Sequence, residues 1–507
     1  MSKREAGVLL HISSLPGRFG IGTFGKDAYK FVDFLEECGF KYWELLPLED
    51  IGKGNSPFDI LSAYSTNYLF IDFDELIKDG LLTSRDLTGK VFESNPRKVD
   101  YLLIRPLKLE ILKVAFKRFD RSNPEFIKMK NSRFRFDYAL FQTIRQHNNN
   151  AAWFDFRLEE RYFDQELKEE YIKKYSDEID FYIFITYIFH KQYFKLKQYA
   201  NSKGIEIIGE IPHFVSYNSD SMYMNPELFM IDKRNIPTYV VGFPPDNFRK
   251  DGQKWGYPLY DWEYMKINNY KWWRHRLDTA AMFYDRIKLN HFRGFYVVYA
   301  VPFKSKNGRK GKYFEGPGLE FINEIKSDYP LIANDLGTYS KDVSEFVEKS
   351  GLESLRVLLI NLFEDKFYRE EFLPSNITEN TYFYIENHDN LPIKGLLEVL
   401  NQEQIEIGKK RVIEEAKKLG LKVNGNLSLF EKTRFIMEIA LASRANHVSL
   451  TMQDILFQGK NSRMNEPGTV NENNWTYRFL WHDLTEPIKK SLKELLLKYN
   501  RSNLKNN

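Results

Sequence analysis

A single cysteine, Cys38, occurs in the chain of 507 residues. One thiol can form no internal disulfide and cannot supply a cysteine-based metal site, and such scarcity is usual in a reducing compartment. The N-terminal apolar run "GVLL" is too short for the core of a signal peptide, and no other stretch approaches the length of a membrane span. We therefore expect a cytoplasmic protein that does not enter a membrane.

An excess of charge of one sign is also missing. The 74 basic residues nearly balance the 70 acidic ones, which gives a formal net charge of +4. This balance provides no broad electrostatic attraction for nucleic acid or for an anionic membrane, whereas a neutral partner is compatible with it. Aromatic residues are abundant, at 16% of the chain, and suffice for a core and for a flat-walled binding cleft.

Three common catalytic motifs are absent from the sequence. No serine lies in a G-x-S-x-G turn, so a hydrolase of that kind is not indicated. There is no H-E-x-x-H zinc-binding spacing and no glycine-rich phosphate loop of the P-loop type. We therefore expect no metal and no cofactor.

Short apolar or β-branched runs that end in polar residues recur along the chain. Segments with helical spacing lie between most of them, such as 26–39 and 341–351, where apolar residues recur three or four positions apart. Gly39 and Gly351 stand where the C-caps of these helices are expected. Strands that alternate with helices indicate a parallel sheet, and eight of them predict a (β/α)8 TIM barrel of the α/β class. The eight runs begin at residues 7, 42, 205, 286, 330, 354, 382 and 447.

Two long stretches interrupt the alternation. Residues 71–200 are rich in charged and aromatic residues with helical spacing, and we interpret them as a helical insertion subdomain. Residues 212–270 contain Pro, Gly and Asn and favour a loop-rich insertion that lines a cleft. We expect the whole chain, 1–507, to form a single barrel that carries both insertions.

Polar residues gather at the ends of three predicted strands. In a barrel of this kind, the chemistry belongs at the carboxyl ends of the strands. Lys288 and Asn290 share one face of their strand because side chains alternate. Asn334 ends another strand, and His388 with Asp389 ends a third. These residues form either a structural cluster at the barrel rim or a functional site, and the pattern alone leaves both interpretations open.

The order of motifs resembles the 4-α-glucanotransferases called amylomaltase or disproportionating enzyme, in glycoside hydrolase family 77, a branch of the α-amylase-like barrels. The match runs from "GVLLHISSLPGRFGIGTFG" to "RMNEPGTVNENNWTYR" and so covers nearly the whole chain. Between them, "WELLPL", "SPFDILSAYSTNYL", "NPELF", "GFPPDNF", "GQKWGYPLYDW", "HFRGF" and "NHDN" follow the family's order. The resemblance implies transfer of α-1,4-glucan segments between malto-oligosaccharides.

The resemblance also implies a retaining mechanism. One carboxylate attacks the anomeric carbon, a second acid protonates the leaving oxygen, and a sugar hydroxyl takes the intermediate. Asn290 stands where the family's Arg-Ile-Asp-His-Phe-Arg-Gly has the nucleophilic Asp, and Asn334 where Ala-Glu-Asp-Leu-Gly has the acid/base Glu. Only the third carboxylate, the transition-state stabiliser, is kept, as Asp389.

Further residues in the matching motifs are expected to contact sugar. Aromatic faces pack on pyranose rings, and polar groups pair with hydroxyls. Ser221 stands where relatives have a sugar-contacting Asp. The residues that the resemblance places in the substrate-binding cleft are Lys288, His291, His388, Trp255, Gln253, Phe58, Tyr64, Ser221 and Asn465.

The two amides change what the mechanism can do. An amide carries no negative charge and releases no proton near neutral pH. General acid catalysis alone is typically worth ~10² to 10⁴ in rate, and rescue by Glu210 or Glu386 would require a separation between the acids of ~5 Å. Two main hypotheses stay open: a 4-α-glucanotransferase, or a catalytically silent relative that binds α-glucan. A hydrolase with water as the acceptor is a third.

Overall fold

The computed structural model of the protein describes residues 4–52, 54–245, 250–336, 340–365, 368–423 and 427–504. Its centre is a closed barrel of parallel strands in the order β1-β12-β11-β10-β9-β6-β3-β2. The strands are β1 (Glu5–Leu9), β2 (Tyr42–Leu45), β3 (Glu206–Ile211), β6 (Arg286–Leu289), β9 (Leu331–Ala333), β10 (Glu353–Val357), β11 (Thr381–Tyr384) and β12 (His447–Thr451). Each of them coincides with a run predicted from the sequence, so the predicted TIM barrel is confirmed.

Two glycines allow aromatic rings to lie against the barrel strands. A Cβ at Gly7 in β1 would lie 2.0 Å from the ring of Tyr42, and one at Gly209 in β3 would lie 2.1 Å from the ring of Tyr284. A glycine inside a strand often marks such a close approach. These contacts help to pack the barrel wall without a gap.

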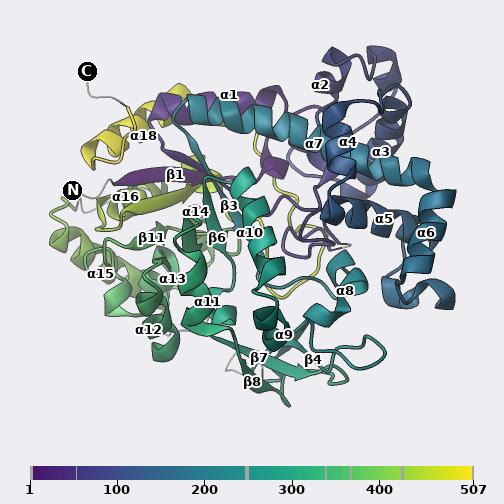
Figure 1. Cartoon of the computed structure of the whole chain (residues 1–507). Coiled ribbons are helices and arrows are strands. Elements are labelled where there is room, and N and C mark those ends of the chain that lie inside the picture. Colours follow the sequence, from purple (N-terminus) through teal and green to yellow (C-terminus); the bar gives the residue numbers. More distant parts are fainter. Residues whose placement is uncertain are drawn as a thin grey trace.

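Helices surround the barrel (Figure 1). Both helices predicted from apolar spacing form, as α1 (Lys26–Cys38) and α12 (Lys341–Ser350). Their C-caps, Gly39 and Gly351, adopt the left-handed conformation with φ of 88° and 72°, which glycine adopts most readily. No helix among the described residues is long and apolar enough to cross a bilayer. The other helices around the barrel include α10 (Lys271–Phe283), α11 (Gly318–Ile325), α13 (Leu358–Phe363), α14 (Ile393–Val399), α15 (Gln402–Lys418), α16 (Leu429–Ala442) and α18 (Glu486–Lys498).

The chain between β2 and β3 is largely helical. Figure 1 shows α2 to α6 grouped at one end of the molecule, whereas α7 reaches back along the barrel and packs against α1 and β3. The last helix of the stretch 71–200 therefore also belongs to the barrel wall. The helices are α2 (Phe73–Lys78), α3 (Tyr101–Lys117), α4 (Pro124–Lys130), α5 (Arg133–His147), α6 (Gln165–Lys174) and α7 (Ser176–Ser202).

The stretch 212–270 contains regular structure besides loops. It holds α8 (Asp220–Met224), β4 (Tyr239–Phe243), β5 (Gln253–Pro258) and α9 (Trp262–Ile267). With β7 (Val297–Pro302) and β8 (Lys312–Glu315), the two strands form an antiparallel sheet in the order β5-β4-β7-β8. Part of the motif "GFPPDNF" lies outside the described residues, in the gap 246–249.

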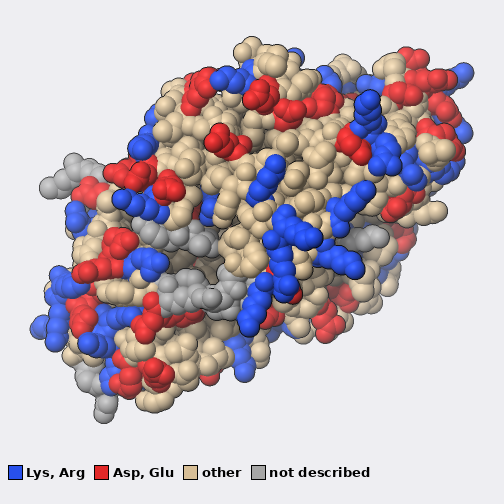
Figure 2. Space-filling view, turned by 90° about the horizontal axis from the view of Figure 1, so that it is seen from below, with Lys and Arg blue, Asp and Glu red and all other residues tan. Residues whose placement is uncertain are grey.

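The surface carries both signs of charge. On the face shown in Figure 2, acidic and basic side chains are interspersed over most of the area, with a group of Lys and Arg near its middle. This distribution matches the balanced composition.

An ion cluster closes the amino-terminal end of the barrel. Arg286 Nη2 lies 2.8 Å from Glu5 Oε2 and 2.7 Å from Glu206 Oε2, and His447 Nδ1 lies 2.5 Å from Glu353 Oε1. Burial alone would lower the pKa of His447, but hydrogen bonds to Glu353 and Glu5 raise it above the ordinary value. The ring therefore connects β12 to β10 and β1.

This geometry predicts a pH dependence of stability. Because the pKa of His447 is raised in the folded state, its contribution is fully present below the unfolded value of about 6.5 and is lost as pH rises through the folded pKa. His447→Gln should therefore reduce the free energy of unfolding more at about pH 6 than at about pH 9. Urea unfolding of both proteins at both pH values measures the difference, and an equal loss at the two values would refute the assignment.

Candidate active site

Three charged side chains meet inside the barrel. Lys288 Nζ lies 2.5 Å from Glu44 Oε1 and 2.9 Å from Glu210 Oε2. They come from β6, β2 and β3, which are neighbours in the barrel, and none is more than 2% exposed. Burial lowers the pKa of Lys288, but the two carboxylates outweigh it and raise that pKa above the ordinary value. The lysine therefore stays charged between them.

Hydroxyl groups donate further hydrogen bonds to the carboxylate of Glu44. Its Oε2 accepts hydrogen bonds from Ser449 Oγ at 2.8 Å and from the Tyr382 hydroxyl at 3.1 Å. The Tyr384 hydroxyl also donates to Glu44 and accepts from Lys288 Nζ at 2.9 Å. Burial and the charge of Glu44 raise the pKa of both tyrosines well above the ordinary value, so they act as neutral donors. A buried charge is tolerated when hydrogen bonds of this kind complete it.

Two amides bind the same oxygen of Glu210. Asn290, which follows β6, donates from Nδ2 at 2.7 Å to Glu210 Oε1, and Asn334, which follows β9, donates at 2.6 Å to that atom. The predicted placement of Lys288 and Asn290 on one face is confirmed, because both contact Glu210. Burial raises the pKa of Glu210, but the charges of Lys288 and His388 and the Asn290 hydrogen bond lower it overall. Glu210 is thus a carboxylate.

Asp389 lies in the loop that follows β11, and its side chain is 38% exposed. Its Oδ1 accepts a hydrogen bond from Asn465 Nδ2 at 2.7 Å. The neighbouring His388 stacks on Phe58, with ring centroids 5.0 Å apart and an angle of 26° between the planes. The structure therefore brings four of the predicted site residues together at this strand end.

His291 is close enough to both Glu210 and Asp389 to interact with their charges. Burial lowers its pKa, while the charges of Glu210 and Asp389 act to raise it, so the ring lies within electrostatic reach of both. It adopts a left-handed backbone with φ of 46°, a conformation that is uncommon outside glycine and worth noting at functional sites. The residues predicted at the strand ends therefore converge on one region.

An aromatic wall borders this region. The indole of Trp255 in β5 lies 5.2 Å from the ring of His291, at 37° between the planes. Trp255 Nε1 donates to Gln253 Oε1 at 3.0 Å. Trp255 therefore lies next to His291, and the contact of Trp255 and Gln253 with sugar stays a prediction.

Tyr64 and Ser221 are buried, and their hydroxyl groups bond within the protein. Tyr64 is 5% exposed, stacks on Phe134, and donates from its hydroxyl to the Trp272 carbonyl at 3.1 Å. Ser221 is 2% exposed and donates to Asp220 Oδ1 at 3.0 Å. Both hydroxyls are used inside the protein, which gives no support to their predicted contacts with sugar.

Sequence reasoning missed the central role of two acids. Glu44 was not singled out, and Glu210 was considered only as a substitute acid. The available signal was a lone carboxylate inside the apolar runs "YWELL" and "IIGEI", because charged residues are rarely buried without partners.

Two further carboxyl groups, Asp335 and Glu386, follow the strands β9 and β11. Asp335, next to Asn334 in the chain, pairs with Arg356 Nη1 at 2.7 Å. Burial and the charge of Asp454 raise the pKa of Glu386 well above the ordinary value, which disfavours its ionised form. Gly337, which completes the motif around Asn334, lies outside the described residues.

A closed parallel barrel with polar side chains at the carboxyl ends of its strands defines a TIM-barrel protein, and enzymes of this fold carry their active sites at that end. The sequence profile of the 4-alpha-glucanotransferases, glycoside hydrolase family 77, matches residues 10–483. The chain belongs to this family, which confirms the resemblance seen in the sequence.

Relatives match the chain over almost its full length. A 4-alpha-glucanotransferase of Aquifex aeolicus is 35% identical over 505 residues, 98% of this chain and 99% of the relative. That of Clostridium butyricum is 33% identical over 97% of this chain and 100% of its own. The structure of amylomaltase from Streptococcus agalactiae in complex with acarbose superposes with a TM-score of 0.91 at 34% identity, covering 99% and 100% of the two chains.

The charged centre predicts a large effect of one substitution. Lys288→Met leaves Glu44 and Glu210 buried without their shared cation, which typically costs ~3 to 5 kcal/mol of unfolding free energy. The exposed Lys349→Met is the matched control and should change stability by less than ~0.5 kcal/mol. Urea unfolding measures both. Similar stability of the two variants would show that the cluster does not depend on Lys288.

Proposed function

We propose that this protein binds α-1,4-glucans, such as malto-oligosaccharides, at the carboxyl ends of the barrel strands, and that two amides weaken the family's transfer reaction there. Its membership of the 4-alpha-glucanotransferase family supports the substrate class. The observation that carries the proposal is the binding of both Asn290 and Asn334 to the single carboxylate of Glu210. We further propose a cytoplasmic location, with no role for nucleic acid or membrane.

The proposed reaction is the retaining double displacement of the family. Asn290 takes the position of the attacking group, but its uncharged amide cannot form the usual glycosyl ester. Asn290 Nδ2 donates to Glu210. The carbonyl oxygen of the Asn290 amide is therefore the atom that can approach the anomeric carbon. Asp389 is the carboxylate that would stabilise the positive charge developing on the sugar.

Asn334 takes the position of the acid/base group. Its Nδ2 donates to Glu210, and its Oδ1 accepts from the backbone N–H of Leu336 at 3.3 Å. Both the nitrogen and the oxygen of this amide therefore have hydrogen-bond partners within the protein. Protonation of the leaving oxygen, and later activation of the acceptor hydroxyl, both lack a titrating group at this position.

Glu210 is poorly suited to replace either group. It is fully buried, one oxygen accepts both amides, and the other pairs with Lys288. Its lowered pKa disfavours the protonated form that an acid requires. A hydrolase that uses water as the acceptor needs the same two groups, so water would not restore the rate.

The second candidate function is a catalytically silent relative that binds α-glucan. The internal use of both ends of the Asn334 amide favours it. The binding residues in either case are Trp255, Gln253, His291, His388, Phe58, Lys288 and Asn465, with Lys288 acting through Glu210.

Maltotriose disproportionation tests the proposal. The unaltered chain should redistribute maltotriose at least ~10²-fold more slowly than the Asn290→Asp, Asn334→Glu double variant, because the variant regains both an attacking carboxylate and a general acid. Release of glucose and formation of longer maltodextrins are measured together. Their balance separates transfer from hydrolysis, since hydrolysis forms no longer chains.

Controls keep the test interpretable. Asn268→Asp at an exposed helix end should leave the rate unchanged, and unfolding midpoints should show that the double variant folds despite the new carboxylate beside Glu210. Fast transfer by the unaltered chain would refute the weakening by the amides. A folded double variant that binds maltoheptaose but gains no activity would refute the roles assigned to positions 290 and 334.

A further inference from the structure

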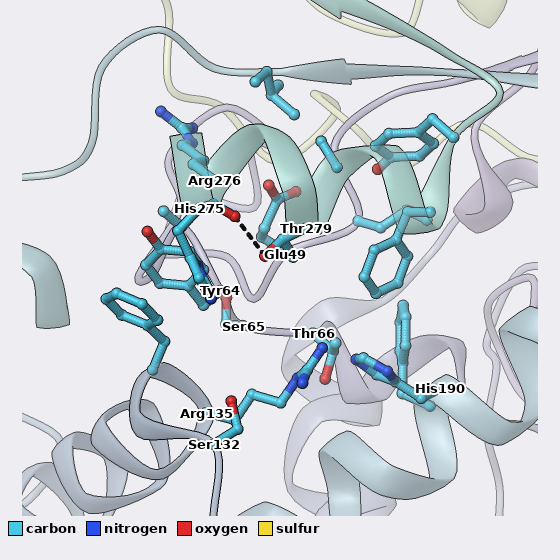
Figure 3. Close-up of a pocket in the computed structure, with 18 residues that line it drawn as sticks. Glu49, Tyr64, Ser65, Thr66, Ser132, Arg135, His190, His275, Arg276 and Thr279 are labelled. Carbon is cyan, nitrogen blue, oxygen red and sulfur yellow. Dashed lines mark hydrogen bonds between the residues drawn. The ribbon is translucent and has the colours of Figure 1, made fainter. Parts of the chain in front are cut away.

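A second cavity lies on the outer side of β3, between the barrel and the helices α5, α7 and α10 (Figure 3). Ile211 lines it, whereas Glu210, one residue earlier in the strand, points into the barrel. Because side chains alternate along a strand, the cavity and the strand-end cluster are on opposite faces of β3. It is therefore separate from the proposed glucan site.

The cavity wall contains a guanidinium group without a counter-ion. Arg135, in the first turn of α5, forms no hydrogen bond or ion pair among the residues that the structure describes, and burial lowers its pKa. Figure 3 shows its side chain extending beside Thr66 toward His190. The side chain is partly buried and has no carboxylate beside it among the described residues, so this group can receive an anion.

Further polar groups face the same space. Thr66 is 3% exposed and Glu49 is 9% exposed, and within the described part of the chain Thr66 Oγ1 and Glu49 Oε2 have no hydrogen-bond partner. His190 is also buried, and Ser132 lies at the more open side. Two of these groups are thus nine-tenths buried, unpaired and part of the wall.

The balance of donors favours an oxyanion. Burial lowers the pKa of His190 to about 3, so its ring is neutral and offers one N–H. Burial raises the pKa of Glu49, the one carboxyl group in the described lining, to about 7, so it donates an O–H below neutrality. Arginine and hydroxyl groups together are typical of phosphate recognition.

We propose that this cavity binds a tetrahedral oxyanion, inorganic phosphate or the phosphate group of a monoester, with Arg135 as the charged partner and Thr66, Ser132 and His190 as hydrogen-bond donors. The ligand would enter between α5 and α10, where Ser132, Arg135 and His275 are partly exposed. Arg135 belongs to the helices between β2 and β3, and Ile211 to the barrel, so the anion would connect the two parts.

Calorimetric titration of the full chain tests the proposal, with inorganic phosphate and methyl phosphate as separate probes and sodium chloride at equal ionic strength as the reference. Phosphate should bind and raise the unfolding midpoint by ligand linkage, whereas chloride should do neither. Preference for one probe identifies the free ion or the ester as the ligand. Failure of both probes to bind would overturn the proposal.

Substitutions locate the binding. Arg135→Gln should weaken phosphate binding at least ~10-fold, through loss of the charge-assisted hydrogen bonds. Arg133→Gln, two residues earlier on the same helix with a side chain that is 69% exposed, is the matched control and should leave it unchanged. Equal loss in both variants, or none in either, would place the anion elsewhere and overturn the assignment.

A third variant, at Glu49, should strengthen phosphate binding. Glu49→Gln removes the carboxyl that repels an anion when it is ionised, so phosphate should bind more tightly above about pH 7. The other charged or titratable groups near Glu49 are Arg276, Tyr284, Tyr64, Arg135, His190 and His275, and they are unchanged in this variant. If Arg135→Gln does not fold, this gain still tests the site, and weaker binding by Glu49→Gln would contradict it.

Discussion

The ion pair of Lys288 with two buried carboxylates sets the charge at the centre of the barrel. Glu44 and Glu210 lie on adjacent strands, and the lysine between them compensates charge that the interior would otherwise not tolerate. Glu210 therefore stays ionised and can hold the amides of Asn290 and Asn334. The polar network thus extends from the barrel interior to the rim where β6 and β9 end.

The fold of this protein and the reaction of its family depend on different features. The barrel belongs to the scaffold that the chain shares with its 4-alpha-glucanotransferase relatives. The family's chemistry, by contrast, depends on a negative charge at one atom and a transferable proton at another. If Asn290 and Asn334 hold the catalytic positions, as proposed, their amides keep the hydrogen bonds to Glu210 but supply neither property, so turnover can be lost while binding is kept.

Much of the fold was predictable because its signals are local. The barrel strands are short apolar runs, and the helices α1 and α12 have regular apolar spacing and end at Gly39 and Gly351. The sheet of β4, β5, β7 and β8 was not predicted, since β5 and β8 are not apolar runs and are mostly half-buried or exposed. The role of Glu44 was also missed, because its partner Lys288 is 244 residues away in the sequence. Similarly, no local pattern predicts that the Tyr64 hydroxyl donates a hydrogen bond to the Trp272 carbonyl.

A crystal structure with bound maltoheptaose is the most direct test of the central claim. The account predicts an unbroken glucan across the carboxyl ends of the strands, with one glycosidic bond between Asn290 and Asn334, Asp389 against the sugar, and Glu210 still bound to both amides. A sugar joined covalently to Glu210 would contradict it, as would a glucan bound away from these residues.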